Sequence, residues 1–177
     1  PTTGTRLHNL ALLLRKKGAL AAAEPLCRRA LAITETALGP YHPETAISLN
    51  SLRTLLEARG DFDAAIPLNR RALEITENTL GREDPETVRR LNNLGLLIKD
   101  HGDLDEAESF FQRAIDAANT IFAPDHSETA ISLNNLALVL EKRGNVKTAE
   151  IHYRRAIAIG EIAWGPNHSN TGVMLHN

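Results

Sequence analysis

The chain has 177 residues, a net charge of −2 and 42% hydrophobic residues, values close to those of ordinary globular proteins. The near-neutral charge gives no electrostatic case for binding nucleic acid or an anionic membrane, and no apolar run approaches the ~20 residues of a membrane span. Aromatic residues make up only 4%, which favours close packing of helices over an aromatic-rich sheet.

Two features bear on the cellular context. The single cysteine, Cys27, cannot form an intrachain disulfide, so the chain needs no oxidising compartment. No signal or transit peptide is visible, and the first residue is Pro1 rather than Met, as in a fragment of a longer protein. We therefore expect a cytoplasmic protein.

An internal repeat organises the chain. The glycines Gly18, Gly60, Gly102 and Gly144 follow one another at intervals of 42 residues. The segment 44–50 reads ETAISLN and recurs letter for letter at 128–134. We expect one repeat array that fills residues 1–177, with repeats at about 1–42, 43–84, 85–126 and 127–168 and the start of a fifth, or a partial cap, at 169–177.

Each repeat is predicted to contain two helices. In the first, apolar residues recur at helical spacing, as Leu91, Leu94 and Ile98 do in the third repeat. A glycine then ends this helix, because glycine enters the left-handed conformation without strain. A second helix follows with an alanine-rich pattern that includes Ala107 and Ala114. The sequence thus predicts an all-α solenoid of antiparallel helix pairs, with eight helices and a partial ninth.

The entry to each first helix carries a capping pattern. Asp84 precedes Pro85, which suits the first helical position, and His42, His126 and His168 take the place of Asp84 in the other repeats. These histidines do not suggest a metal site, because neighbouring repeats lie ~8–10 Å apart and metal ligation needs bonds of about 2 Å. We expect them to cap helices, and we expect no metal and no cofactor.

The second helices carry a recognisable signature. Gly102, Leu104, Ala107, Phe111 and Ala114 give a glycine, an apolar residue, an alanine, a large residue and an alanine at fixed spacing. This pattern resembles that of the tetratricopeptide repeat (TPR) family, whose usual unit has about 34 residues. The longer period and the motifs LNNLxLxL, AExxxRRAL and LGPxHP are similar to the repeats of kinesin light chain and of large bacterial arrays. The resemblance implies a right-handed superhelix that binds proteins and is not an enzyme.

The resemblance also implies a binding face, because the first helices of TPR arrays line the concave side. Asparagine recurs there, and a carboxamide both donates and accepts hydrogen bonds, so it can hold the backbone of an extended peptide of any sequence. The alternative is that these asparagines only tie neighbouring helices together. The candidate peptide-binding residues are Asn9, Asn50, Thr54, Arg89, Asn92, Asn93, Leu96, Lys99, Asn134, Asn135 and Leu138.

Charged residues expected on this face give a slight positive excess. Five cations stand against three anions, which marginally favours an acidic peptide. The cations are Arg15, Lys16, Arg89, Lys99 and Lys142, and the anions are Glu57, Asp100 and Glu141.

The second repeat departs from the pattern at two positions. Arg53 stands where the other repeats have a small residue, and Asn69 stands where they have Cys27, Phe111 and Tyr153. We expect the two changes to be coupled, with a hydrogen bond between their side chains. A further departure is Ala123, which replaces the glycine after the second helix and would be strained at positive φ.

Other reactive-looking residues have structural explanations. The paired arginines of the second helices, such as Arg28 and Arg154, are expected to be solvated partners of Glu24 and Glu150 four residues upstream. Cys27 is expected to be a small buried residue rather than a nucleophile.

The sequence leaves three functions open. The favoured one is a binding module that recognises an extended or helical segment of another protein. The second is an architectural array that associates end to end, and the third is the regulatory arm of a larger multidomain protein. No P-loop, zinc-protease or nucleophile-elbow motif is present, so we expect no enzymatic activity.

Overall fold

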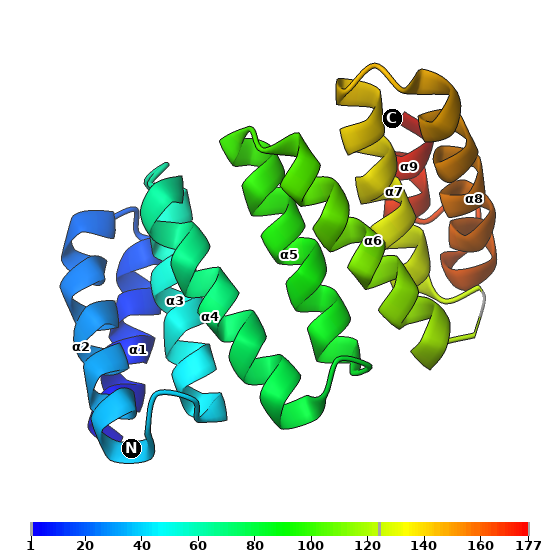
Figure 1. Ribbon diagram of the computed structural model, residues 1–177. Helices are drawn as coiled ribbons and strands as arrows, with labels where there is room; N and C mark the ends of the chain where they lie inside the picture. The colour runs from blue at the N-terminus through cyan, green and yellow to red at the C-terminus, as the bar shows by residue number, and fades with distance from the viewer. Residues whose placement is uncertain (1, 124, 177) are drawn as a thin grey trace. The chain divides into compact units, whose positions relative to one another are not determined.

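The computed structural model describes residues 2–123 and 125–176, and these contain nine α-helices and no strand (Figure 1). The all-α prediction is confirmed. The chain divides into two compact units, residues 1–79 (unit 1) and 80–177 (unit 2). The helices are α1 (Thr2–Lys16), α2 (Leu20–Leu38), α3 (Pro43–Ala58), α4 (Phe62–Leu80), α5 (Pro85–His101), α6 (Leu104–Ile121), α7 (Ser127–Lys142), α8 (Val146–Trp164) and α9 (Ser169–His176).

The helix starts follow the repeat. The first helices begin at Pro43, Pro85, Ser127 and Ser169, at the residues where the 42-residue period places the start of each repeat. The glycine that follows α5, Gly102, has φ 108° and ψ −4°, the left-handed conformation that a side chain would oppose. Its amide donates to the carbonyls of Ile98 and Lys99 and closes the helix.

The packing contacts of unit 1 join α1, α2 and α3. Helix α2 packs against both α1 and α3, and the two first helices α1 and α3 also touch directly. Small residues on α2 permit the close approach, since Ala23, Cys27 and Ala30 are all buried. The matching face of α3 supplies Leu49, Leu52 and further leucines to the core. This packing is the layered arrangement expected of a solenoid.

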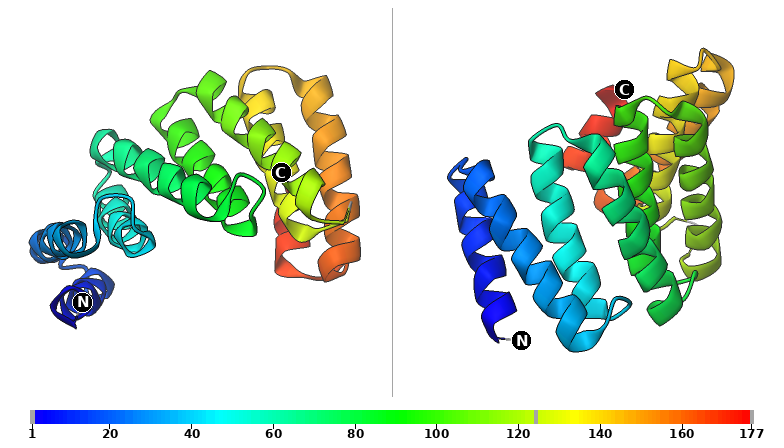
Figure 2. Two further views of the ribbon diagram at one scale, coloured as in Figure 1. Left: turned by 60° about the horizontal axis from the view of Figure 1, so that its bottom comes forward. Right: turned by 60° about the vertical axis from the view of Figure 1, so that its left-hand side comes forward.

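Unit 2 repeats the arrangement with five helices (Figures 1 and 2). Helices α5 and α6 form one pair, α7 and α8 the next, and α9 packs against α8. The first helices α5 and α7 touch directly, as α1 and α3 do in unit 1. Each unit therefore has its first helices as neighbours on one side, which is the geometry required for a shared binding face.

In the core of unit 2, the ring of Phe111 packs directly against the backbone of Gly95. Phe111 of α6 is fully buried, and a Cβ placed on Gly95 of α5 would lie 2.7 Å from its Cε1 atom. Since real Cβ contacts are never this short, the ring occupies the space that any larger residue at position 95 would need. The small residue predicted at this position of the repeat therefore has a steric reason.

Histidine caps are observed as predicted. Nδ1 of His42, His126 and His168 accepts a hydrogen bond from the amide two residues on, at 3.1, 3.2 and 3.2 Å, and Asp84 Oδ1 does the same at 2.8 Å. Among the described residues no group of histidine, cysteine and carboxylate side chains could hold a metal ion.

Helix α6 ends without a described residue at positive φ. Within the described residues no residue other than glycine has positive φ, so Ala123 avoids the strain that we considered. The chain instead leaves the helix at Phe122, which is extended at φ −105°. Its ring stacks on His126 with centroids 3.8 Å apart. The next residue, Pro124, lies outside the described residues.

None of the helices in the described residues is both long and apolar enough to cross a membrane.

Candidate functional site

The predicted binding residues of unit 2 lie on α5 and α7, and several of them are already engaged within the protein. Asn92 is 4% exposed, and its Nδ2 donates to Ser132 Oγ at 2.8 Å. Asn135 Nδ2 of α7 donates in return to Asn92 Oδ1 of α5 at 3.5 Å, a long hydrogen bond. These contacts join the third and fourth repeats, which is the alternative role that the sequence left open.

Unit 1 contains the equivalent contact. Ser51 Oγ of α3 lies 2.8 Å from His8 Nδ1 of α1, and the two residues are 43 positions apart, as are Asn92 and Asn135. In both units, a polar residue on one first helix therefore bonds to a polar residue on the following first helix. The partner stands one position further along its own repeat. The sequence signal was the polar residue at both positions of every repeat, and pairing between neighbouring helices is the alternative that the sequence left open.

The remaining candidate residues of unit 2 divide by exposure. Asn93 and Arg89 are exposed, Leu96 and Leu138 are half-buried, and Asn134 is buried. On α5 the exposed stripe follows helical spacing through Arg89, Asn93 and Leu96. The surface available to a ligand thus consists of an asparagine amide, a leucine and a guanidinium on one helix face, with Leu138 on the neighbouring helix α7.

Two cations of this face, Arg89 and Lys99, are paired with nearby carboxylates. Arg89 binds Glu86 with Nη2 to Oε2 at 2.8 Å, and this hydrogen bond is the first cause of the raised pKa of Arg89. Lys99, whose side chain is 14% exposed, lies 3.3 Å from Asp100. Glu141 accepts from the Tyr153 hydroxyl at 2.8 Å, and burial together with this bond raises the pKa of Tyr153. Local pairing reduces the positive excess counted from the sequence.

In unit 1 the candidates are held by a local network on α3. Asn50 Oδ1 accepts from Arg53 Nε at 3.0 Å and from Nη2 at 2.7 Å, while Thr54 Oγ1 donates to the carbonyl of Asn50. Arg53 also pairs with Glu57 one turn on. Asn9 of α1 is exposed.

The predicted bond between Arg53 and Asn69 does not form. The guanidinium of Arg53 binds Asn50, Thr54 and Glu57 of its own helix, and the buried Asn69 Nδ2 has no hydrogen-bond partner. The correction has a simple cause, because residues three and four positions away on a helix lie within easy reach of a long side chain.

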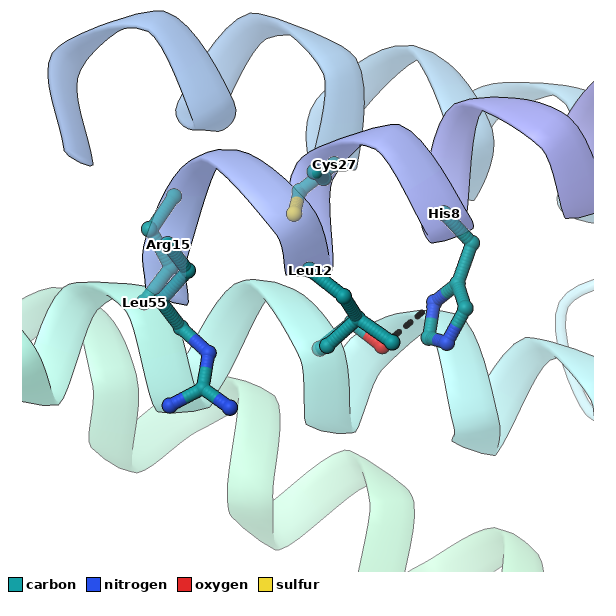
Figure 3. Close-up of a pocket in the computed structure, with 7 residues that line it drawn as sticks. His8, Leu12, Arg15, Cys27 and Leu55 are labelled. Carbon is teal, nitrogen blue, oxygen red and sulfur yellow. Dashed lines mark hydrogen bonds between the residues drawn. The ribbon is translucent and has the colours of Figure 1, made fainter. Parts of the chain in front are cut away.

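A small cavity lies between α1 and the helices α2 and α3 (Figure 3). It has a volume of about 10 Å³, room for no more than one water molecule, and Cys27, Arg15, Leu12, His8 and Leu55 are among its lining residues. Burial raises the pKa of the Cys27 thiol, against a smaller opposing effect of Arg15. The predicted buried, unreactive cysteine is consistent with both observations.

The paired arginines behave as predicted. Arg28 and Arg154 contact Glu24 and Glu150 at 2.8 and 2.7 Å, and Arg71 binds Glu35 and the carbonyl of Pro40. These pairs are at least partly exposed and contribute little to stability.

The comparisons with known proteins agree with this architecture. The tetratricopeptide repeat family model matches residues 3–78, 54–119 and 88–162. The chain belongs to the tetratricopeptide repeat family. No curated protein sequence matches the chain.

Similar solved structures include repeats of a putative kinesin light chain. A putative kinesin light chain of Podosopora anserina with nearly identical TPR-like repeats has a TM-score of 0.80 and 22% identity, covering 97% of this chain and 82% of that one. BtubC (BKLC) from P. vanneervenii has a TM-score of 0.78 and 24% identity, with 88% of this chain and 62% of that chain covered. RapI in its apo form has a TM-score of 0.75 and 16% identity, covering 90% and 56%.

These likenesses establish the fold, an all-α solenoid of TPR helix pairs. The chain spans only part of the BtubC and RapI chains. TPR repeats generally mediate protein–protein interaction, and that general role applies to this chain.

Proposed function

We propose that the chain is a protein-binding module rather than an enzyme, and that unit 2 holds a segment of its partner on the face made by α5 and α7. The observation that carries the proposal is the stripe of Arg89, Asn93 and Leu96 on α5 beside Leu138 on the adjoining helix. An exposed amide can pair with a peptide backbone, and half-buried leucines can accept apolar side chains. In this proposal, Asn92 and Asn135 join neighbouring repeats rather than hold the ligand.

Unit 1 presents a smaller surface of the same type. Asn9 is exposed on α1, whereas the acceptor oxygen of Asn50 and the hydroxyl of Thr54 are engaged within α3. We propose that this surface binds more weakly, because fewer of its polar atoms are available to a ligand.

The preference for acidic segments is the weaker part of the proposal. It rests on the cations of the face, and the pairs Arg89–Glu86 and Lys99–Asp100 neutralise much of their charge. Any preference should therefore be small and should fade with added salt.

A peptide-array experiment tests the proposal. Arrays of random peptides in acidic, neutral and basic sets are probed with the wild type and with the Asn93→Ala/Leu96→Ala variant. We expect the variant to lose most binding across all sets, because the removed contacts do not read sequence. The matched control is Asn119→Ala, which changes an exposed asparagine of α6. Equal binding by wild type and the Asn93/Leu96 variant would exclude this face.

End-to-end self-association is a second proposal, favoured by exposed leucines on α1. Leu10 and Leu13 are 45% and 49% exposed, whereas Leu52 and Leu55 at the same repeat positions are 1% exposed. Light scattering of the Leu13→Asp variant tests it, since loss of association at high concentration would be expected.

A further inference from the structure

The outer face of α8 differs from that of every other second helix. Ile151 and Ile162 are 65% and 68% exposed, the two highest values among the exposed large apolar side chains of the described residues. At about 100° per residue, both project in nearly the same direction as the exposed Ala158, which lies between them along the helix. The result is a narrow apolar stripe along most of α8.

The repeat shows that the architecture does not require this stripe. The positions equivalent to Ile151 and Ile162 are also exposed in the other repeats, so this face stays open when a following repeat is present. There they hold proline or polar residues. The equivalent residues are Pro25, Pro67 and Ser109 for Ile151, and Thr36, Asn78 and Thr120 for Ile162.

The charges beside the stripe have a self-complementary order. Arg154 and Glu161 lie on the same flank of the stripe, and both are exposed. Arg154 pairs only with Glu150 of its own helix, and the Glu161 carboxylate has no ion-pair partner among the described residues. In an antiparallel pair of identical helices, like flanks face each other, so a cation near one end meets an anion near the other.

We infer that α8 is a homodimerisation surface that pairs antiparallel with α8 of a second copy. With the two-fold axis near residues 156 and 157, Ile151 faces Ile162 of the second copy and Arg154 approaches Glu161 of the second copy. The small side chain of Ala158 lies near the axis and lets the backbones approach. Such an interface is isologous, with every contact made twice.

This inference is independent of ligand binding on the inner face. The stripe uses residues of α8, and the proposed peptide site uses α5 and α7. A single helix pair buries less than the ~1,200 Å² of a typical stable interface, so the dimer should be weak and concentration-dependent.

Sedimentation equilibrium of the 177-residue chain, from micromolar to millimolar concentration, provides the first test. We expect the wild type to dimerise reversibly and the Ile151→Asp/Ile162→Asp variant to stay monomeric with unchanged helicity. Val146→Asp is the matched control, because Val146 is 60% exposed on α8 but lies off the stripe. A monomeric wild type, or a dimer lost only in Val146→Asp, would overturn the proposal.

Charge exchange tests the register. Arg154→Glu and Glu161→Arg should each weaken dimerisation several-fold, and the double variant should recover most of the lost affinity, because it restores both ion pairs with reversed sign. Absence of recovery in the double variant would contradict the antiparallel register.

Cysteine crosslinking gives a geometric test. The only native cysteine, Cys27, is buried, so it adds little background. A mixture of the Ile151→Cys and Ile162→Cys variants should form disulfide-linked dimers under mild oxidation, and each variant alone should not. Crosslinking of either variant alone at the level of the mixture would refute the antiparallel arrangement.

Discussion

The close contact between Gly95 and Phe111 predicts that adding a single methyl group at position 95 lowers the stability of the protein. A Cβ on residue 95 would meet the ring at 2.7 to 3.0 Å, so Gly95→Ala must displace the fully buried Phe111. We expect a loss of about 1–3 kcal/mol in the free energy of unfolding, although alanine itself favours a helix by about 0.5–1 kcal/mol. Urea unfolding followed by circular dichroism measures the change.

Two further variants separate the clash from general effects. Gly172→Ala in α9 is the control, because a Cβ there meets nothing within 4 Å and should cost no stability. Phe111→Leu should cost less in the Gly95→Ala background than in the wild type, since the clash is already relieved there. A Gly95→Ala protein as stable as the wild type would show that the ring is not confined.

Residue-level expectations succeeded where the repeat constrains a position and failed where a side chain is long. The repeat makes position 95 small because helices pack closely there, and the buried Cys27 follows from the same spacing. Arg53 was assigned the wrong partner, because its flexible side chain finds Asn50 and Glu57 on its own helix before it reaches another. Sequence spacing limits which partners are possible but does not rank them.

At the scale of elements, the cap of α7 gives a second prediction. His126 Nδ1 accepts from the amide of Glu128, and its ring stacks on Phe122. His126→Ala removes both contacts and should cost about 1 kcal/mol or somewhat more. His126→Asp should keep the cap, as Asp84 does for α5, and lose only the stacking. Thermal unfolding at neutral pH would rank the three proteins.

The reciprocal change is the control for this cap. Asp84→His should leave α5 capped, because histidine fills the same position before α3 and α7. If His126→Ala and His126→Asp had equal stability, capping by the imidazole would contribute nothing, and the stacking with Phe122 would account for any loss.

Element boundaries were the most predictable part of the fold. Proline, capping residues and glycine mark the helix ends in the sequence, and the first helices begin where the period places them. The end of α6 could not be foreseen in the same way. Phe122 leaves the helix in an extended conformation, and its ring stacks on His126 four residues on, a contact that backbone propensity does not encode.

At the scale of the whole molecule, the regular 42-residue repeat did not predict two properties of the structure. The period is uniform, yet the chain divides into two compact units near residue 79, and no composition change marks that point. The asparagines also look equivalent in the sequence, although Asn92 is buried between helices and Asn93 is exposed. A residue's rotation around its helix, rather than its type, decides whether it joins repeats or meets a ligand.

The third prediction concerns coupling between repeats. Asn92 bonds to Ser132 and Asn135 on the next first helix, so Asn92→Ala leaves the buried amide of Asn135 without this partner. The expected cost is about 1–3 kcal/mol. Because a repeat array is stabilised by contacts between neighbours, weaker coupling should also make urea unfolding less cooperative and lower its slope. The single Trp164 reports on the fourth repeat while circular dichroism reports on all helices.

Asn93→Ala is the matched control for this prediction, because it removes the same carboxamide from the adjacent, exposed position. It should change the stability by less than about 0.5 kcal/mol. In the wild type and in Asn93→Ala the fluorescence and dichroism transitions should coincide, whereas in Asn92→Ala they should separate.

The unfolding and peptide-array experiments together should distinguish the two variants. Asn92→Ala should lose coupling between repeats, and Asn93→Ala should lose contact with the ligand. Identical unfolding of the two variants would mean that the buried asparagine does not join the repeats, and the assignment of Asn92 to stability and Asn93 to binding would have to be abandoned.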